Sequence, residues 1–174
     1  MNRRGILMFA LLGLLTTAAQ VRAAGVQDEL TATLDGIAEK VVSLAEAMPA
    51  DKYGWRPAGG VRSVSEVFIH IASTNYFLAG QLGQASPPDA PPGNAEKTVT
   101  EKAQVVAALK KSMAHARQAI KGAAAADLEK TVKLFGQQRS YRSVMIIIIE
   151  HASEHLGQSI AYARMNGVAP PWSN

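Results

Sequence analysis

The chain has 174 residues, with 18 lysines and arginines against 14 aspartates and glutamates, and it contains no cysteine. The missing thiols exclude a disulfide framework, thiolate metal ligands and a cysteine nucleophile, so a metal site has to use histidine, carboxylate, amide or water ligands. The formal net charge of +4 is concentrated near the N-terminus and therefore gives no reason to expect nucleic-acid binding.

Residues 1–23 have the composition of a secretory signal peptide. Arg3 and Arg4 precede an apolar run from Ile6 to Leu15, and small residues follow this run. The run is too short to span a bilayer comfortably, which disfavours a membrane anchor. The sequence therefore predicts cleavage, with the bond after Ala23 as the preferred site.

Cleavage after Ala19 or Ala24 is the alternative. With cleavage after Ala23, the remaining residues, 24–174, are expected to form one domain. Without the leader, 15 basic residues face 14 acidic ones, so the mature chain is close to neutral. We expect this domain in the periplasm or outside the cell, without stable membrane insertion. A homodimer is one assembly that the sequence of this domain permits.

The first helix is predicted over residues 26–47, where apolar residues recur at helical spacing and Pro49 ends the pattern. A loop without periodicity follows and contains Trp55. A capping box of Ser63 and Glu66 then begins a second helix that runs to about residue 82. This helix carries a histidine, at position 70, on a mostly apolar inward face.

Residues 83–99 hold four of the eight prolines, which predicts a long crossover, a surface loop, or a flap over a site. A third helix is predicted over about residues 100–121. His115 lies off its apolar stripe, so we expect this histidine at the surface. The weak alternation from Thr131 to Phe135, which Gly136 breaks, indicates a short turn or hairpin fragment before the last helix.

The longest helical pattern begins at Tyr141 and carries two more histidines. His151 and His155 are four residues apart, so they lie one turn apart on one helix face. The same stripe continues through Gln158 and Tyr162. The pair is either buried and hydrogen-bonded, or it supplies two ligands of a metal ion that needs a third ligand from another helix.

Glu154 completes an H-x-x-E-H pattern with this pair. In inverted zinc peptidases the glutamate of such a pattern is a general base. Helical geometry places Glu154 to one side of both histidines, so a solvated position is the default prediction and support of a ligand ring is the alternative. Gln158 lies between the two histidine directions and is the better candidate to support a ligand.

Three elements in order resemble the DinB-like proteins, also described as DinB/YfiT-like metalloenzymes. A Trp-Arg-Pro loop at 55–57 precedes S-V-S-E-V-F-I-H, and the last helix reads H-x-x-x-H-x-x-Q before Y-x-R-x-N-G-x-x-P-P. The resemblance covers nearly the whole mature chain. It implies an all-α four-helix bundle in which His70, His151 and His155 bind a divalent ion, with zinc, nickel and iron all compatible.

The resemblance also implies a metal-dependent hydrolase or a transferase of small molecules such as thiols. The predicted export sets this chain apart, because low-molecular-weight thiols are scarcer outside the cytoplasm. No Ser-His-Asp order or glycine-rich phosphate loop offers another chemistry, so Gln158, Tyr162 and Glu154 are the candidates to orient water or substrate. The alternative is a non-catalytic bundle that serves as a metal-binding or stress-response module.

Overall fold

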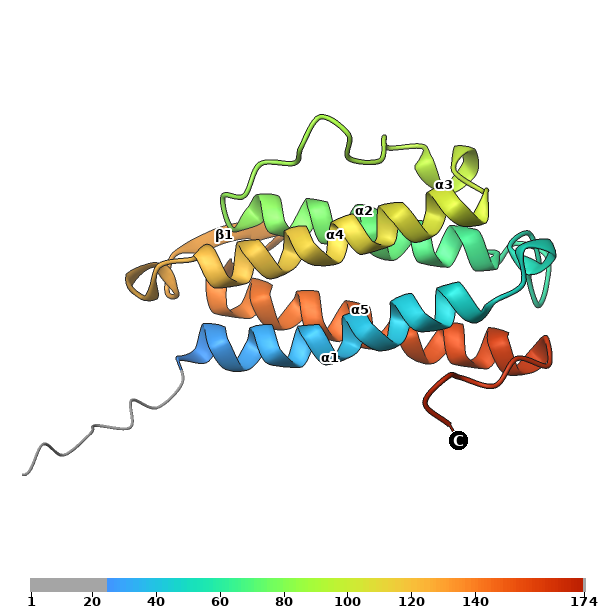
Figure 1. Cartoon of the computed structure of the whole chain (residues 1–174). Coiled ribbons are helices and arrows are strands. Elements are labelled where there is room, and N and C mark those ends of the chain that lie inside the picture. The colour runs from blue at the N-terminus through green and yellow to red at the C-terminus, as the bar shows by residue number, and fades with distance from the viewer. Residues whose placement is uncertain (1–24, 174) are drawn as a thin grey trace, which may run out of the picture.

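Four long helices pack around one core in the computed structural model, which describes residues 25–173 (Figure 1). They are α1 (Val26–Ala47), α2 (Val64–Gln81), α4 (Lys102–Gly122) and α5 (Tyr141–Met165). The four predicted helices are therefore confirmed. The predicted signal peptide lies outside the described residues.

Smaller elements occupy the connections and correct the all-α prediction. They are the one-turn helix α3 (Ala95–Thr98), the strands β1 (Thr131–Leu134) and β2 (Gln137–Ser140), and short 3-10 helices at Ala50–Lys52 and Ala125–Asp127. The two strands pair antiparallel, with Leu134 opposite Gln137. Phe135 and Gly136 form the tight turn between them, at φ 50° and 79°, because a left-handed two-residue turn matches the twist of paired strands. The domain is mostly helical with one small sheet.

One long crossover sets the arrangement of the helices. α1 packs against α4 and α5, and α2 packs against the same two helices. Residues 83–99 run back along the outside of the bundle before α4 begins, so α2 and α4 point in the same direction (Figure 1). This confirms the predicted crossover. Among residues 25–173, no helix is both long and apolar enough to cross a membrane.

Side-chain caps fix the starts of α2 and α5. The Ser63 Oγ accepts a hydrogen bond from the Glu66 N–H at 3.3 Å, and the Glu66 carboxylate accepts one from the Ser63 N–H at 2.7 Å. This pair is the predicted capping box. Ser140 caps α5 by accepting from the Ser143 N–H at 3.2 Å. These caps fix the residue at which each of the two helices begins.

The core draws on all four long helices and is built from aliphatic side chains around Phe68. Its largest fully buried members include Leu34, Leu44, Phe68, Ile71, Leu109, Ile120, Met145 and Ile148. Burial of this apolar surface is the main stabilising contribution in a domain that has no disulfide. The core also holds the backbones of α2 and α5 in fixed contact where the histidines meet.

The prediction that His115 lies at the surface was wrong. Only 8% of this residue is exposed, and its ring packs on Tyr76 of α2 with ring centroids 4.8 Å apart. The single apolar stripe that was read from the sequence assumes one packing partner for the helix. Since α4 contacts both α1 and α2, its buried arc is wider than one stripe and includes His115.

Candidate metal centre

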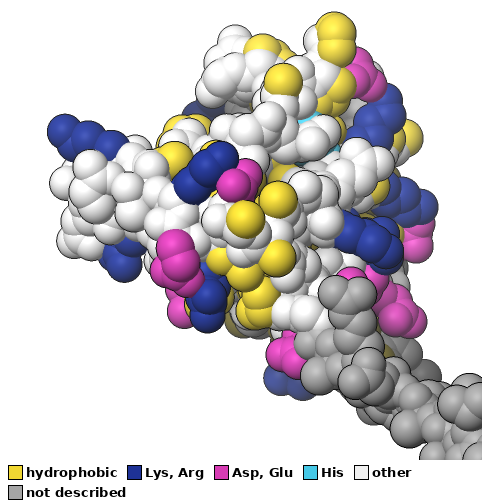
Figure 2. Space-filling view, turned by 90° about the vertical axis from the view of Figure 1, so that its left-hand side faces the viewer, with side chains coloured by type: hydrophobic (Ala, Val, Ile, Leu, Met, Phe, Trp, Pro, Cys, Tyr) yellow, Lys and Arg dark blue, Asp and Glu magenta, His cyan; other side chains and the backbone are white. Residues whose placement is uncertain are grey.

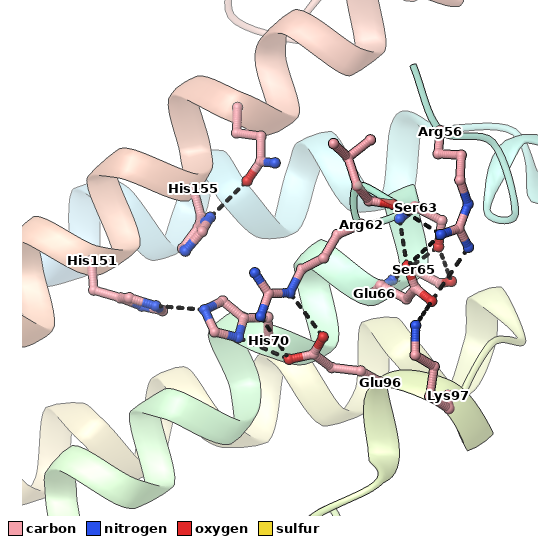
Figure 3. Close-up of polar contacts among 12 residues, drawn as sticks. Arg56, Arg62, Ser63, Ser65, Glu66, His70, Glu96, Lys97, His151 and His155 are labelled. Carbon is pink, nitrogen blue, oxygen red and sulfur yellow. Dashed lines mark hydrogen bonds and ion pairs between the residues drawn. The ribbon is translucent and has the colours of Figure 1, made fainter. Parts of the chain in front are cut away.

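Three histidines from two helices converge where α2 faces α5 (Figure 3). His70 comes from α2, and His151 and His155 come from successive turns of α5. Their ring centroids are 4.5 to 4.9 Å apart, and one nitrogen of each ring lies within 4.8 Å of the corresponding nitrogens of the others. We call these three residues the histidine triad. The structure therefore supplies the third imidazole that the helical pair required.

A carboxylate orients His70. The Nδ1 of His70 lies 2.9 Å from Oε1 of Glu96, and a carboxylate only accepts, so Nδ1 carries the proton and Nε2 keeps a lone pair. Arg62 donates to the same carboxylate through Nε at 2.8 Å. Burial acts to raise the pKa of Glu96, but the hydrogen bonds from Arg62 and His70 outweigh it and lower the pKa, so the carboxylate is charged.

An amide orients His155 in the same manner. Its Nδ1 donates to Oε1 of Gln158 at 2.7 Å, which leaves the Nε2 lone pair free. The Gln158 Nε2 donates to the Tyr162 hydroxyl at 3.1 Å, and that hydroxyl donates to the Arg62 carbonyl at 3.2 Å. Gln158 thus supports a triad ring, as the sequence predicted, and Tyr162 acts one step further away through Gln158.

His151 is a partly buried ring of the triad. Burial, together with the neighbouring His155 and His70, lowers its pKa to about 4, so the ring is neutral at pH 7. Its Nε2 lies 3.1 Å from Nε2 of His70, and its Nδ1 is buried without a hydrogen-bond partner. Because His70 carries its proton on Nδ1, the Nε2–H of His151 donates to the Nε2 lone pair of His70, and a shared cation could take the place of this proton. Neutral imidazole nitrogens are the donors that zinc, nickel and iron accept, so the residues fit a divalent ion.

Comparisons with known proteins identify the family and the fold of the chain. The model of the DinB superfamily matches residues 22–159. This chain belongs to the DinB superfamily. Similar solved structures include a DinB-like protein from Bacillus subtilis, YjoA, at 19% identity and TM-score 0.63, which covers 80% of this chain and 92% of that one.

Two further solved structures share the superfamily's helical fold. A conserved protein from Enterococcus faecalis aligns at 20% identity and TM-score 0.69, over 82% of this chain and 98% of that one. A DinB-like protein from Bacillus cereus aligns at 16% identity and TM-score 0.69, over 83% and 95%. A comparison with functionally curated proteins found no match. At these identities the structures establish the fold, and the activity has to be argued from the site.

Several other residues that were predicted from the sequence to lie at or near the site are not part of the triad of this DinB superfamily member. Glu154 is exposed, which agrees with its default prediction. Trp55 packs edge-on against Tyr162 with ring centroids 5.4 Å apart, and Tyr162 is the hydrogen-bond partner of Gln158. The proline segment does not cover the triad, because Pro87 and Asp89 lie against Tyr76 and Lys111.

Glu96 and Arg62 are the site residues that the sequence analysis missed. They lie 34 positions apart, Arg62 just before α2 and Glu96 on α3, inside the segment predicted as a loop. Helical periodicity carries no information about contacts between two connections. Ala95, the neighbour of Glu96, is fully buried and anchors α3 against the core, but this burial is not visible in the sequence.

Replacing Glu96 with glutamine tests its influence on the triad. We expect the affinity for a divalent ion to fall by about 10–100-fold, because a partner that orients a ligand histidine contributes on that scale. Zinc affinity is measured by competition with a chromophoric chelator. Glu129→Gln is the matched control, since Glu129 pairs with Arg142 at an exposed position. Equal affinity in Glu96→Gln and wild type would show that the carboxylate has no role at the triad.

Proposed function

We propose that this DinB superfamily member is an exported metal-dependent enzyme that acts on small molecules, as a hydrolase or a transferase. His70, His151 and His155 would hold its divalent ion. The observation that carries the proposal is the orientation of the rings. Two Nδ1 atoms are held by Glu96 and Gln158, so the Nε2 lone pairs remain for an ion. Zinc, nickel and iron all accept such a set.

Three neutral ligands favour a catalytic rather than a structural ion. Structural zinc sites use four protein ligands, whereas catalytic sites use three and keep a position for water or substrate. An ion bound here would supply Lewis-acid activation of a water or of a substrate atom. The group of candidate ligands among residues 25–173 contains the three histidines alone. A hollow at the surface also includes His70 and His151 in its wall, which gives a small molecule access to the triad.

The chain's own side chains keep the site oriented. Gln158 holds the proton of His155 on Nδ1, and Glu96 does the same for His70. Arg62 connects the two supports, because its guanidinium binds Glu96 and its carbonyl accepts from the Tyr162 hydroxyl. The rings are therefore set before any ligand arrives. Such preorganisation is what a catalytic site requires.

A comparison of metal-stripped and metal-loaded protein tests this function. We expect activity on a panel of small esters, amides and thiol adducts to require added divalent metal. Activity should vanish in His155→Ala and fall only partly in Gln158→Ala, since Gln158 orients a ring without being a ligand. His115→Ala, which leaves the triad intact, should retain activity per folded molecule. Full activity after chelation, with metal loss verified, would contradict the proposal.

Export is the second part of the proposal and predicts a shortened chain. The basic residues Arg3 and Arg4, the apolar run and the small residues after it support cleavage near Ala23. We expect the exported protein to begin close to Ala24, as read by N-terminal sequencing of protein from the periplasm or the medium. An exported chain that still begins at Met1 would indicate a retained anchor.

A further inference from the structure

A hollow of about 360 Å³ has two histidines of the triad, His70 and His151, in its wall. It is lined by His70, Ser73, Thr74, Phe77, Phe135 and His151. Four of these residues belong to α2 and lie on one face of that helix, with Phe77 two turns after His70. The hollow has the size of a small-molecule site. A molecule that reaches the triad through it lies against these side chains.

Two phenylalanine rings form the outer wall of the hollow. Phe77 is 48% exposed and Phe135 is 75% exposed, and their ring centroids lie 6.0 Å apart. Figure 2 shows the end of the molecule that carries the hairpin, where hydrophobic side chains reach the surface between charged ones. Paired large apolar side chains at the surface of a single chain are informative because they indicate a contact that the chain itself does not make.

The backbone of Phe135 strengthens this argument. Phe135 has φ 50° in the two-residue turn between β1 and β2. Asparagine, aspartate and glycine are the residues favoured at such a position, and a bulky residue there is strained. The ring is mostly exposed, so burial within the chain does not compensate for the strain. Strained residues of this kind cluster at ligand-binding sites.

A larger hollow nearby is a weaker candidate for the substrate. Its volume is about 540 Å³, and charged side chains such as Arg56, Glu66 and Lys97 line it. These charges are already paired, since Lys97 donates to Glu66 at 2.7 Å and Arg56 lies 3.3 Å from the same carboxylate. None of the three histidines is among its lining residues. The larger hollow reaches the supports Arg62, Glu96 and Gln158, whereas the apolar hollow has His70 and His151 themselves in its wall.

We infer that the Phe77–Phe135 hollow binds an aromatic or branched apolar group of the substrate, whose polar reacting end lies at the triad. The inference rests on the proposed function, because it names the substrate class of the same site. Ser73 and Thr74 add hydroxyl groups between the rings and the histidines, where the polar part of the molecule begins. The class is a small ester, amide or thiol adduct with a phenyl-sized substituent.

Two probes that differ only in the apolar group test the inference on metal-loaded protein. Benzohydroxamate and acetohydroxamate carry the same metal-chelating group. We expect benzohydroxamate to bind wild type about tenfold more tightly, from the burial of its ring. This preference should fall to about twofold or less in Phe77→Ala and in Phe135→Asn, while acetohydroxamate binding stays constant. Phe135→Asn places a favoured residue in the turn, so the hairpin is retained.

Met165→Ala is the control, because Met165 is an exposed apolar residue at the far end of α5 and does not line the hollow. This variant should keep the full preference for benzohydroxamate. Equal binding of the two hydroxamates to wild type would overturn the inference and leave the metal proposal standing. A preference that survives both phenylalanine variants would overturn it as well.

A second readout needs no metal. Benzyl alcohol is titrated into chelator-treated protein with labelled phenylalanine, and the ring signals of Phe77 and Phe135 are followed by NMR. Saturable shifts of these signals support binding of an aromatic group in the hollow. If they occur although neither hydroxamate binds, the metal proposal fails and the assignment of the hollow stands. The absence of saturable shifts overturns the inference. So does a wild-type dimer that Phe135→Asn converts to a monomer in sedimentation, because the rings would then form a subunit contact.

Discussion

Replacing His151 with alanine is expected to lower the affinity for a divalent ion by more than about 100-fold, because loss of a partner that merely orients a ligand already costs about 10–100-fold. The same change should leave the metal-free protein about as stable as wild type. The Nδ1 of His151 is buried without a partner, and its Nε2 is 3.1 Å from the Nε2 of His70. Alanine removes the unpartnered Nδ1 and is a better helix former, which offsets the loss of the hydrogen bond between the two Nε2 atoms.

Metal content by elemental analysis and urea unfolding in chelator measure the two halves of this prediction. His115→Ala is the matched control, since His115 is a histidine of the same bundle that is buried against Tyr76. It should retain the ion and lose some stability, because the lost packing of its ring on Tyr76 outweighs the removal of its own unpartnered Nε2. The opposite pattern, with stoichiometric metal and a large loss of stability in His151→Ala, would make His151 an ordinary core histidine.

The largest effect on folding is expected at Phe68. It is a core residue that is 1% exposed, and its ring lies beside that of Tyr53. Phe68→Ala should lower the free energy of unfolding by about 3–5 kcal/mol, from lost transfer free energy and the cavity left behind. Urea denaturation of the metal-free protein measures this value, and in a domain without disulfides such a loss is a large share of the total stability.

Phe77→Ala provides the comparison, because it is the same substitution on the same helix at a residue that is 48% exposed. Its effect should stay within about 1 kcal/mol. The contrast separates the core face of α2 from the face that borders the hollow. Equal losses in the two variants would mean that Phe77 contributes to the core, and its assignment to a ligand site would lose its basis.

The bounds of the helices could be predicted from the sequence because local signals mark their ends. Pro49 ends α1, and the reciprocal hydrogen bonds of Ser63 and Glu66 begin α2. The spacing of His151 and His155 placed two imidazoles on one face, and the structure brings them to His70. Each of these features depends on contacts within a few residues or on helical periodicity.

The remaining features depend on packing between distant segments, which periodicity does not encode. The burial of His115 follows from α4 having two neighbours. Glu96 reaches His70 only because the crossover folds back and ends in α3. The hollow at Phe77 forms because the hairpin brings Phe135 beside α2. Four of the residues that shape the site, Arg62, Glu96, Phe77 and Phe135, were thus beyond the sequence patterns.

X-ray absorption at the metal edge of the protein purified from its own compartment tests the central claim most directly. The account predicts a stoichiometric divalent ion whose nearest shell includes three imidazole nitrogens, at about 2.0–2.1 Å if the ion is zinc. The outer-shell scattering typical of imidazole rings should diminish in His155→Ala. A shell of oxygen ligands without imidazole scattering, or a spectrum that His155→Ala leaves unchanged, would contradict the assignment of His70, His151 and His155 as the metal centre.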